Sequence, residues 1–226
     1  MENSASVIRE TGTPDDLFIP ASRHIVKSGA DSGIRDWIIL GVLNGLVVAM
    51  SHLIFSLYMF LGPLAVFMQF YHQCAENLLI ASVYLLMPVT APHRFAFTLN
   101  AVVWSIMGLM QGWWPVIPVA VPAGIIADLV VRVPCFKKRK AKLLISFAFY
   151  TTMLSIASFW PFMFMKQSSM IRRMTAMDPG IASYIDKFTM PFFTSIMAAS
   201  FISALLGGFM ALRFISRHFA AEGTRS

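Results

Sequence analysis

The sequence predicts an all-α, polytopic membrane protein with six transmembrane helices, and three observations carry this prediction. The chain of 226 residues is 57% hydrophobic and only 13% charged, and its mean hydropathy is +0.68, which excludes a soluble globular protein. Six apolar stretches follow one another along the chain, and the first is long enough to cross about 30 Å of hydrocarbon. The N-terminal residues lack the continuous apolar core of a cleavable signal peptide, so the first helix is expected to direct its own insertion.

The elements follow in order from a flexible cytoplasmic arm at residues 1–35, through a six-helix domain at 36–218, to a cytoplasmic tail at 219–226. The expected helices span residues 37–60, 64–89, 95–111, 113–131, 143–165 and 188–212. A hinge at Gly62 and Pro63 joins the first two helices. Three prolines, Pro115, Pro118 and Pro122, are expected to interrupt the fourth helix, which should therefore lean on its neighbours. The loop at 166–187 is the only long one.

The positive-inside rule orients this bundle, because six helices place both chain ends on one side. That side holds most of the basic residues, namely Lys27, Arg35, Arg94, the basic run at 132–142, Arg213, Arg217 and Arg225. The other side holds Lys166, Arg172, Arg173 and Lys187. We expect both termini in the cytoplasm and the protein in a bacterial cytoplasmic membrane. Loops beside membrane helices and contact with lipid headgroups explain the net charge of +7, so no nucleic-acid partner is expected.

The first helix carries small residues at four-residue spacing, Gly41, Gly45 and Ala49. Such a stripe lets another helix approach closely, so it is a candidate surface for docking a partner. Packing inside this chain's own bundle is the commoner role of such residues. The last helix carries a similar stripe, at Ser203, Gly207 and Ala211. We expect at least one of the two stripes to pack inside the bundle.

The second helix carries a polar stripe. Its members recur every three or four residues and so share one face: Gln69, His72, Gln73, Glu76 and Asn77. Polar groups at membrane depth face a bundle interior or a water-filled cavity, and an ionisable one marks a functional site by default. We interpret the stripe as substrate-binding, in a cavity that opens outward.

Two histidines are expected at one depth. In a tight hairpin, His52 on the first helix lies level with His72 on the second, and two imidazoles there could ligate a metal or a haem iron. The alternative is that each imidazole bonds to a neighbouring helix, or that His72 pairs with Glu76. Any such iron would belong to the ligand, and no resident cofactor is expected.

The long outer loop combines methionines and aromatics with Arg172 and Arg173. This composition suits a lid whose guanidinium groups bind an anionic ligand, and equally an interfacial helix against lipid headgroups. Asp128 is expected to be structural or related to coupling, within reach of Arg132. Cys74 and Cys135 are expected to be plain thiols. Protease, hydrolase and nucleotide-binding motifs are missing from the sequence, so an enzyme is not expected.

Three segments resemble a known family: Gln111-Gly112-Trp113-Trp114-Pro115, residues 123–129, and residues 205–208 leading to Arg217-His218-Phe219 and Gly223. The sequence is similar to the MptD-type (Trep_Strep) S components of energy-coupling factor (ECF) transporters. The resemblance implies a six-helix substrate-capture subunit with a transmembrane T component and two cytoplasmic ATPases as partners. It also implies that Gly41, Gly45 and Ala49 contact the T component, with glycines where alanines are usual. Haem is linked to some members of the family.

These expectations combine into one functional hypothesis. The chain captures a small organic or metal-bearing ligand, with haem as the first candidate, in an outward-facing pocket, and docks a T component through its first helix. His52 and His72 would ligate iron, and Arg172 or Arg173 would meet propionates. The alternative is a membrane scaffold or assembly protein without transport activity, in which the polar stripe only holds helices together.

Overall fold

The computed structural model describes residues 31–61, 68–91, 94–133, 139–177, 185 and 188–220, and contains helices and turns but no strand within these ranges. The proposed hinge at Gly62 and Pro63 lies outside the described residues. So do residues 1–30 of the expected arm and the basic residues Lys187 and Arg225. Cys135 and Gly223 also lie outside them.

The described helices are α1 (Asp31–Met59), α3 (His72–Leu79), α4 (Ala81–Thr90), α5 (Ala96–Met110), α6 (Ile117–Arg132), α7 (Arg139–Phe164), α8 (Ser169–Met177) and α10 (Met190–Ala220). A short 3-10 turn, η3 (Trp114–Val116), precedes α6. Four segments are long and apolar enough to cross a membrane, namely Gly33–Tyr58, Trp114–Arg132, Arg139–Phe164 and Met190–Arg217. The helices α4 and α5 are apolar but shorter.

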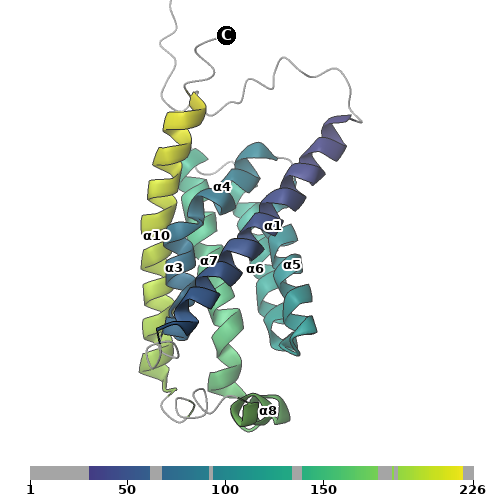
Figure 1. Cartoon of the computed structure of the whole chain (residues 1–226). Helices are drawn as coiled ribbons and strands as arrows, with labels where there is room; N and C mark the ends of the chain where they lie inside the picture. Colours follow the sequence, from purple (N-terminus) through teal and green to yellow (C-terminus); the bar gives the residue numbers. More distant parts are fainter. Residues whose placement is uncertain are drawn as a thin grey trace, which may run out of the picture.

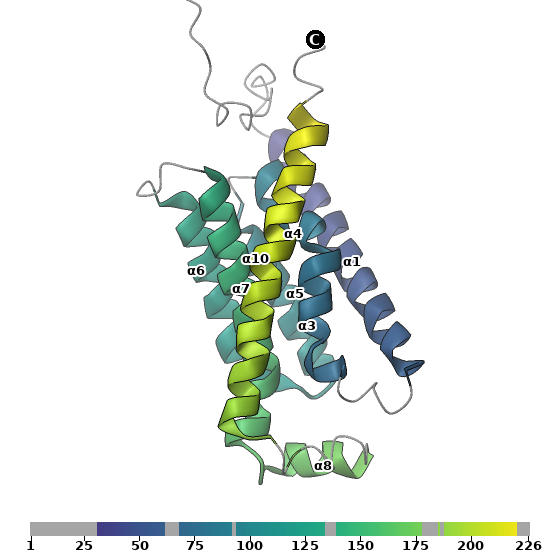
Figure 2. The ribbon, with the colours of Figure 1, turned by 90° about the vertical axis from the view of Figure 1, so that its left-hand side faces the viewer.

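The long helices run along a common axis, and α7 lies between α6 and α10 (Figures 1 and 2). Helix α5 packs on α6, whereas α3 and α4 pack on α10. Helix α1 crosses the bundle at a steep tilt and packs mainly on α4. The start of α1 and the end of α10 lie at one end of the bundle, and α8 lies at the other, roughly across the bundle axis.

The prediction of one continuous second helix over 64–89 is wrong in one respect. Its described part is divided into α3 and α4 by a break at Ile80. No proline or glycine lies between residues 77 and 83 to announce this break. The cause lies in packing, since the break follows the point where α3 approaches α10 most closely. There a Cβ atom added to Gly207 would collide with the carbonyl oxygen of Asn77.

The interruption of the fourth helix is also corrected by the structure. Pro115 lies in η3 and Pro118 lies in the first turn of α6, where a missing backbone N–H breaks no helical hydrogen bond. Pro122 lies inside α6, which nevertheless continues to Arg132. The helix packs against α5 and α7, so the expectation that it leans on neighbours is confirmed.

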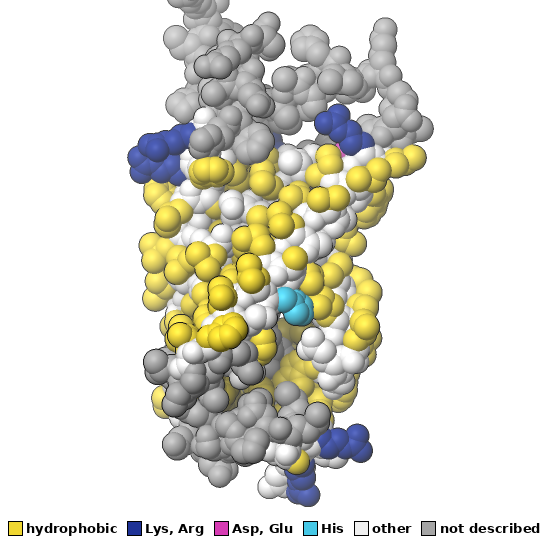
Figure 3. Space-filling model, in the orientation of Figure 1, with side chains coloured by type: hydrophobic (Ala, Val, Ile, Leu, Met, Phe, Trp, Pro, Cys, Tyr) yellow, Lys and Arg dark blue, Asp and Glu magenta, His cyan; other side chains and the backbone are white. Residues whose placement is uncertain are grey.

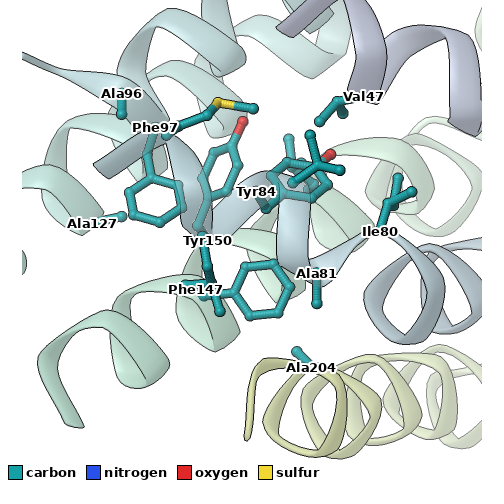
Figure 4. Close-up of a cluster of buried hydrophobic side chains, with 14 of the residues drawn as sticks. Val47, Ile80, Ala81, Tyr84, Ala96, Phe97, Ala127, Phe147, Tyr150 and Ala204 are labelled. Carbon is teal, nitrogen blue, oxygen red and sulfur yellow. The ribbon is translucent and has the colours of Figure 1, made fainter. Parts of the chain in front are cut away.

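The main core is formed by apolar side chains from α1, α4, α5, α6, α7 and α10 (Figure 4). Tyr84 of α4 and Tyr150 of α7 are fully buried within it. A buried polar chain crosses this core: the Tyr150 hydroxyl donates to Oδ1 of Asn100 over 2.7 Å, and Nδ2 of Asn100 donates to Oδ1 of Asn44 over 2.8 Å. These bonds tie α7, α5 and α1 together, since groups withdrawn from water need such partners.

Asp128 joins α6 to the start of α5. Its Oδ2 accepts hydrogen bonds from the backbone N–H of Thr98 at 2.8 Å and from the Thr98 hydroxyl at 2.7 Å, and its Oδ1 accepts from the backbone N–H of Phe97 at 3.1 Å. A carboxylate at a helix N-terminus satisfies backbone donors that have no partner inside the helix. The structural role expected for Asp128 is confirmed, although its hydrogen-bond partners are these donors.

The outer surface is apolar along the middle of the bundle, and the basic side chains gather towards the two ends (Figure 3). Large exposed hydrophobics include Ile38 and Val42 on α1 and Phe209 and Met210 on α10. In a soluble protein a belt of this kind would be unstable, but in a bilayer it contacts lipid. The structure therefore supports an integral membrane protein.

Candidate functional site

A cavity of about 320 Å³ lies in the bundle between α1, α3, α5 and α7. Its lining contains four of the residues that the sequence singled out, together with aromatic, aliphatic and hydroxyl side chains: Ser51, His52, Phe55, His72, Gln73, Glu76, Trp104, Met107, Gly108, Gln111, Trp113, Val116, Leu154 and Ser158. The size is at the lower end of the range for small-molecule sites. It suits a compact ligand.

Glu76 supplies the acidic group of this lining. Its side chain is 4% exposed, and its Oε2 accepts a hydrogen bond from Nε2 of Gln73 at 3.2 Å. No lysine or arginine is present among the described lining residues. The Ser51 hydroxyl lies near the carboxylate but, within the described chain, makes no hydrogen bond of good geometry. A buried carboxylate and a buried hydroxyl thus border the same space with hydrogen-bonding capacity to spare.

The two expected histidines do line one cavity. In each, Nδ1 lies within hydrogen-bond distance of a carbonyl oxygen of its own segment: His52 to Val48 at 2.8 Å and His72 to Gln69 at 2.7 Å. When Nδ1 carries the proton and donates in these bonds, Nε2 of a neutral imidazole is left as an acceptor. A backbone partner of this kind is also what orients metal-binding imidazoles. His52 is exposed at the cavity's edge, and His72 is partly buried.

Two residues on the α5 side of the cavity were not singled out from the sequence, Trp104 and Met107. They lie on α5 and line the cavity together with Gln111, which follows the last residue of that helix and which the resemblance had named. Their spacing of three and four residues was the available signal, but in an apolar helix such a stripe is more often plain core. The indole N–H of Trp104 is buried near the Tyr84 hydroxyl, but within the described chain it makes no hydrogen bond of good geometry.

The end of α5 is shaped by Gly112, whose φ of 75° is readily adopted only by glycine. The N–H of Trp113 turns back to bond the carbonyl of Gly108 at 2.6 Å. This turn places Trp113 at the cavity and next to Phe162, with ring centroids 5.3 Å apart. The segment that carries the family resemblance therefore forms one wall of the cavity.

Four of the predicted substrate-binding residues lie away from the lining. Asn77 is fully buried, and its Nδ2 donates to the Ser200 carbonyl at 2.9 Å, so it joins α3 to α10. Gln69 is partly buried and offers its carbonyl to His72. Arg172 and Arg173 are exposed on α8. The structure thus brings His52, His72, Gln73 and Glu76 together and leaves these four outside.

The two stripes of small residues have different surroundings. Gly41, Gly45 and Ala49 are exposed on α1, and a Cβ atom added to either glycine would have no neighbour within 4 Å. Gly207 on α10 instead lies against the backbone of α3. The expectation that one stripe is internal is confirmed for α10, and the stripe on α1 is open at the surface.

Metal chemistry finds limited support in this arrangement. Among the described residues no group of three or more His, Cys, Asp or Glu side chains is placed to hold a metal ion. The cavity lining contains two imidazoles and one carboxylate, on α1 and α3, but these three groups are not placed together as a set of metal ligands.

Fold and surface together define an integral membrane protein built from several apolar helices. Residues 34–221 match the family model described as "Hypothetical bacterial integral membrane protein (Trep_Strep)". The chain belongs to this family, and it is a bacterial membrane protein that contacts lipid. A comparison with curated proteins and one with solved structures each found no match.

Proposed function

We propose that the chain is the substrate-capture (S) subunit of an ECF-type importer. In this proposal the bundle crosses the membrane six times, with α3 and α4 forming one crossing and α5 another. Both termini are cytoplasmic. The cavity between α1, α3, α5 and α7 holds a small organic ligand. A T component docks on α1, and two ATPase subunits supply the energy.

One observation carries the proposal: the open stripe of small residues and the residues that line the cavity lie at different positions along the same helix, α1. At the two glycines of the stripe, Gly41 and Gly45, an added Cβ atom would have no neighbour within 4 Å in the described chain, so this face of α1 is open to a partner helix. Further along the same helix, Ser51 and His52 line the cavity. A subunit that meets a partner helix at one level and a ligand at another needs such a division.

Haem, the first ligand candidate from the sequence, keeps only part of its support. The two imidazoles border the cavity, but Arg172 and Arg173 do not. Propionates would find the Glu76 carboxylate and no basic side chain among the described lining residues, and like charges repel in a medium of low dielectric. Hemin titration tests this, and we expect no Soret band that depends on His52 and His72. A band lost in the double variant His52→Ala, His72→Ala would assign the iron to them.

The docking role is tested by co-purification with a T component. Gly45→Leu adds a bulky side chain to the open stripe and is expected to abolish the complex, because close helix approach is lost. Ala198→Leu is the matched control, since Ala198 is a small exposed residue on α10. An undiminished complex with Gly45→Leu would refute docking through this stripe.

The second candidate is a membrane scaffold or assembly protein. The contacts of Asn77 with α10 favour it, because one member of the polar stripe joins two helices and does not line the cavity. Native mass spectrometry of the purified chain separates the two candidates. A tightly held small molecule supports capture, and a chain that holds none but retains a protein partner supports the scaffold.

A further inference from the structure

The cavity opens sideways, between α1 and α5. On the face that carries these two helices, a histidine side chain lies exposed among apolar side chains, and the surface beside it is hollowed (Figure 3). His52 and Phe55 are the exposed cavity residues on α1. Helix α1 packs mainly on α4 and only weakly on α5, and the two helices diverge towards the α8 end (Figure 1).

This mouth lies within the apolar span and away from the aqueous end of the bundle. His52 is about 9 Å along α1 from Tyr58, where the span Gly33–Tyr58 ends. The helices beside the mouth present exposed apolar side chains, including Phe55 and Leu57 on α1 and Ile106 on α5. Side chains of this kind face acyl chains, so a molecule dissolved in the leaflet can approach the cavity over a largely apolar surface, on which His52 and Gln111 are the exposed polar lining residues.

The polar groups that line the cavity favour a positively charged ligand. Glu76 is buried and, among the described lining residues, has no lysine or arginine beside it. An ionised carboxylate in this position is costly unless a cation or several donors accompany it, and the described chain supplies one donor of good geometry, Nε2 of Gln73. The Nε2 atoms of His52 and His72 add acceptors when those imidazoles are neutral. A cationic or donor-rich ligand satisfies these groups, whereas an anionic ligand is repelled.

The walls favour a flat, apolar body attached to that charge. Trp104, Trp113 and Phe55 line the cavity, and aromatic faces attract organic cations through their quadrupoles. The cavity volume of about 320 Å³ limits the body to one or two rings.

We propose that the cavity binds a small lipophilic organic cation, which reaches Glu76 from the membrane through the gap between α1 and α5. This inference deepens the proposed function and rests on it for the direction of transport. It specifies a ligand of one or two rings that partitions into the membrane.

Binding is measured on the full chain in lipid nanodiscs with tritiated 1-methyl-4-phenylpyridinium as the probe. Competition with its uncharged analogue 4-methylbiphenyl and with biphenyl-4-carboxylate isolates the charge, because all three have two rings. We expect saturable binding of the cation, weaker competition by the neutral analogue and none by the carboxylate. Equal competition by the carboxylate overturns the proposal, and this comparison needs no variant.

A matched pair of variants then locates the charge. Glu76→Gln keeps the shape of the side chain and should weaken cation binding by at least about tenfold, because a buried charge pair is lost. Asp36→Asn removes a carboxylate at the other end of α1 and should leave binding unchanged. Binding of the cation that is insensitive to Glu76→Gln contradicts the assignment.

The sideways mouth has its own test. A nitroxide is attached at His52→Cys, in a chain with Cys74→Ser and Cys135→Ser, and its collisions are measured with oxygen, which concentrates in hydrocarbon, and with a water-soluble nickel chelate. We expect oxygen to dominate, as at the lipid-facing control Leu53→Cys, and the cation probe to reduce collisions only at residue 52. Dominance of the nickel chelate would overturn the membrane route.

These tests are separable from the proposed function. They use the subunit alone, so cation binding can succeed even when no T component docks and the importer role fails. Conversely, loss of the complex in Gly45→Leu together with absent cation binding would support the importer role and reject this ligand class.

Discussion

The imidazole of His52 lies parallel to the indole of Trp104, with 3° between the ring planes and 6.5 Å between the centroids. The two rings come from α1 and α5, and both line the cavity. In the proposed route between α1 and α5, Trp104 would therefore contact a ligand beside His52.

Trp104→Leu should weaken binding of the pyridinium probe, because the aliphatic side chain has no quadrupole to attract a cation. The loss should be about 0.5–2 kcal/mol of binding free energy. The control is Trp114→Leu, since Trp114 is half-exposed and does not line the cavity. Equilibrium binding in nanodiscs measures both, and equal losses in the two variants would show that Trp104 has no special role.

Gly207→Ala should destabilise the bundle, whereas Gly41→Ala should not. An added methyl group at Gly207 meets the Asn77 carbonyl, and overpacking of this kind costs about 1–3 kcal/mol. Gly41 has open space, and alanine favours the helix by up to about 1 kcal/mol. Thermal unfolding in one detergent compares the variants, and a Gly207→Ala chain as stable as Gly41→Ala would contradict the close packing of α3 on α10.

Asp128→Asn should lower the free energy of unfolding by about 1–3 kcal/mol, because a charged acceptor of three hydrogen bonds is replaced by a neutral amide. Thr98→Val removes only the hydroxyl donor and should cost less, about 1 kcal/mol. The same unfolding assay applies. The clamp between α6 and α5 would be refuted if Asp128→Asn melted at the temperature of the unmodified chain.

Tyr150→Phe and Asn44→Ala should each destabilise the chain, and their effects should not add. Both side chains bond to the same Asn100 amide, so removing one partner changes what the other is worth. We expect a coupling energy of about 0.5 kcal/mol or more in a double-mutant cycle. Strict additivity would show that the three residues do not act as one network.

The sequence was sufficient to predict helices and their faces where periodicity is strong. The apolar runs give the long helices to within several residues, and the three- and four-residue spacing correctly placed His72, Gln73 and Glu76 on one face. Hairpin geometry correctly anticipated that His52 would share their cavity. These features depend on local regularity, which a single sequence records.

Features set by contacts between distant segments could not be predicted. Rotation of α3 about its axis decides that Asn77 meets Ser200 while Glu76 meets the cavity, although both belong to one stripe. The break at Ile80 comes just after the chain packs against Gly207. Gly45 and Gly207 belong to stripes with the same four-residue spacing, and only the structure shows that Gly207 lies against α3 whereas Gly45 has open space around it.

Helix α1 is fastened at one end. Among the described residues, its ion pair and its hydrogen bond to other helices involve Asp36, 3.7 Å from Arg94, and Asn44, bonded to Asn100. Beyond Asn44 its contacts are largely apolar side chains, which slide at less cost than directed bonds. The first half of α1 is therefore held by directed bonds, whereas its second half, which carries His52, can shift against the neighbouring helices without breaking a hydrogen bond or an ion pair among the described residues.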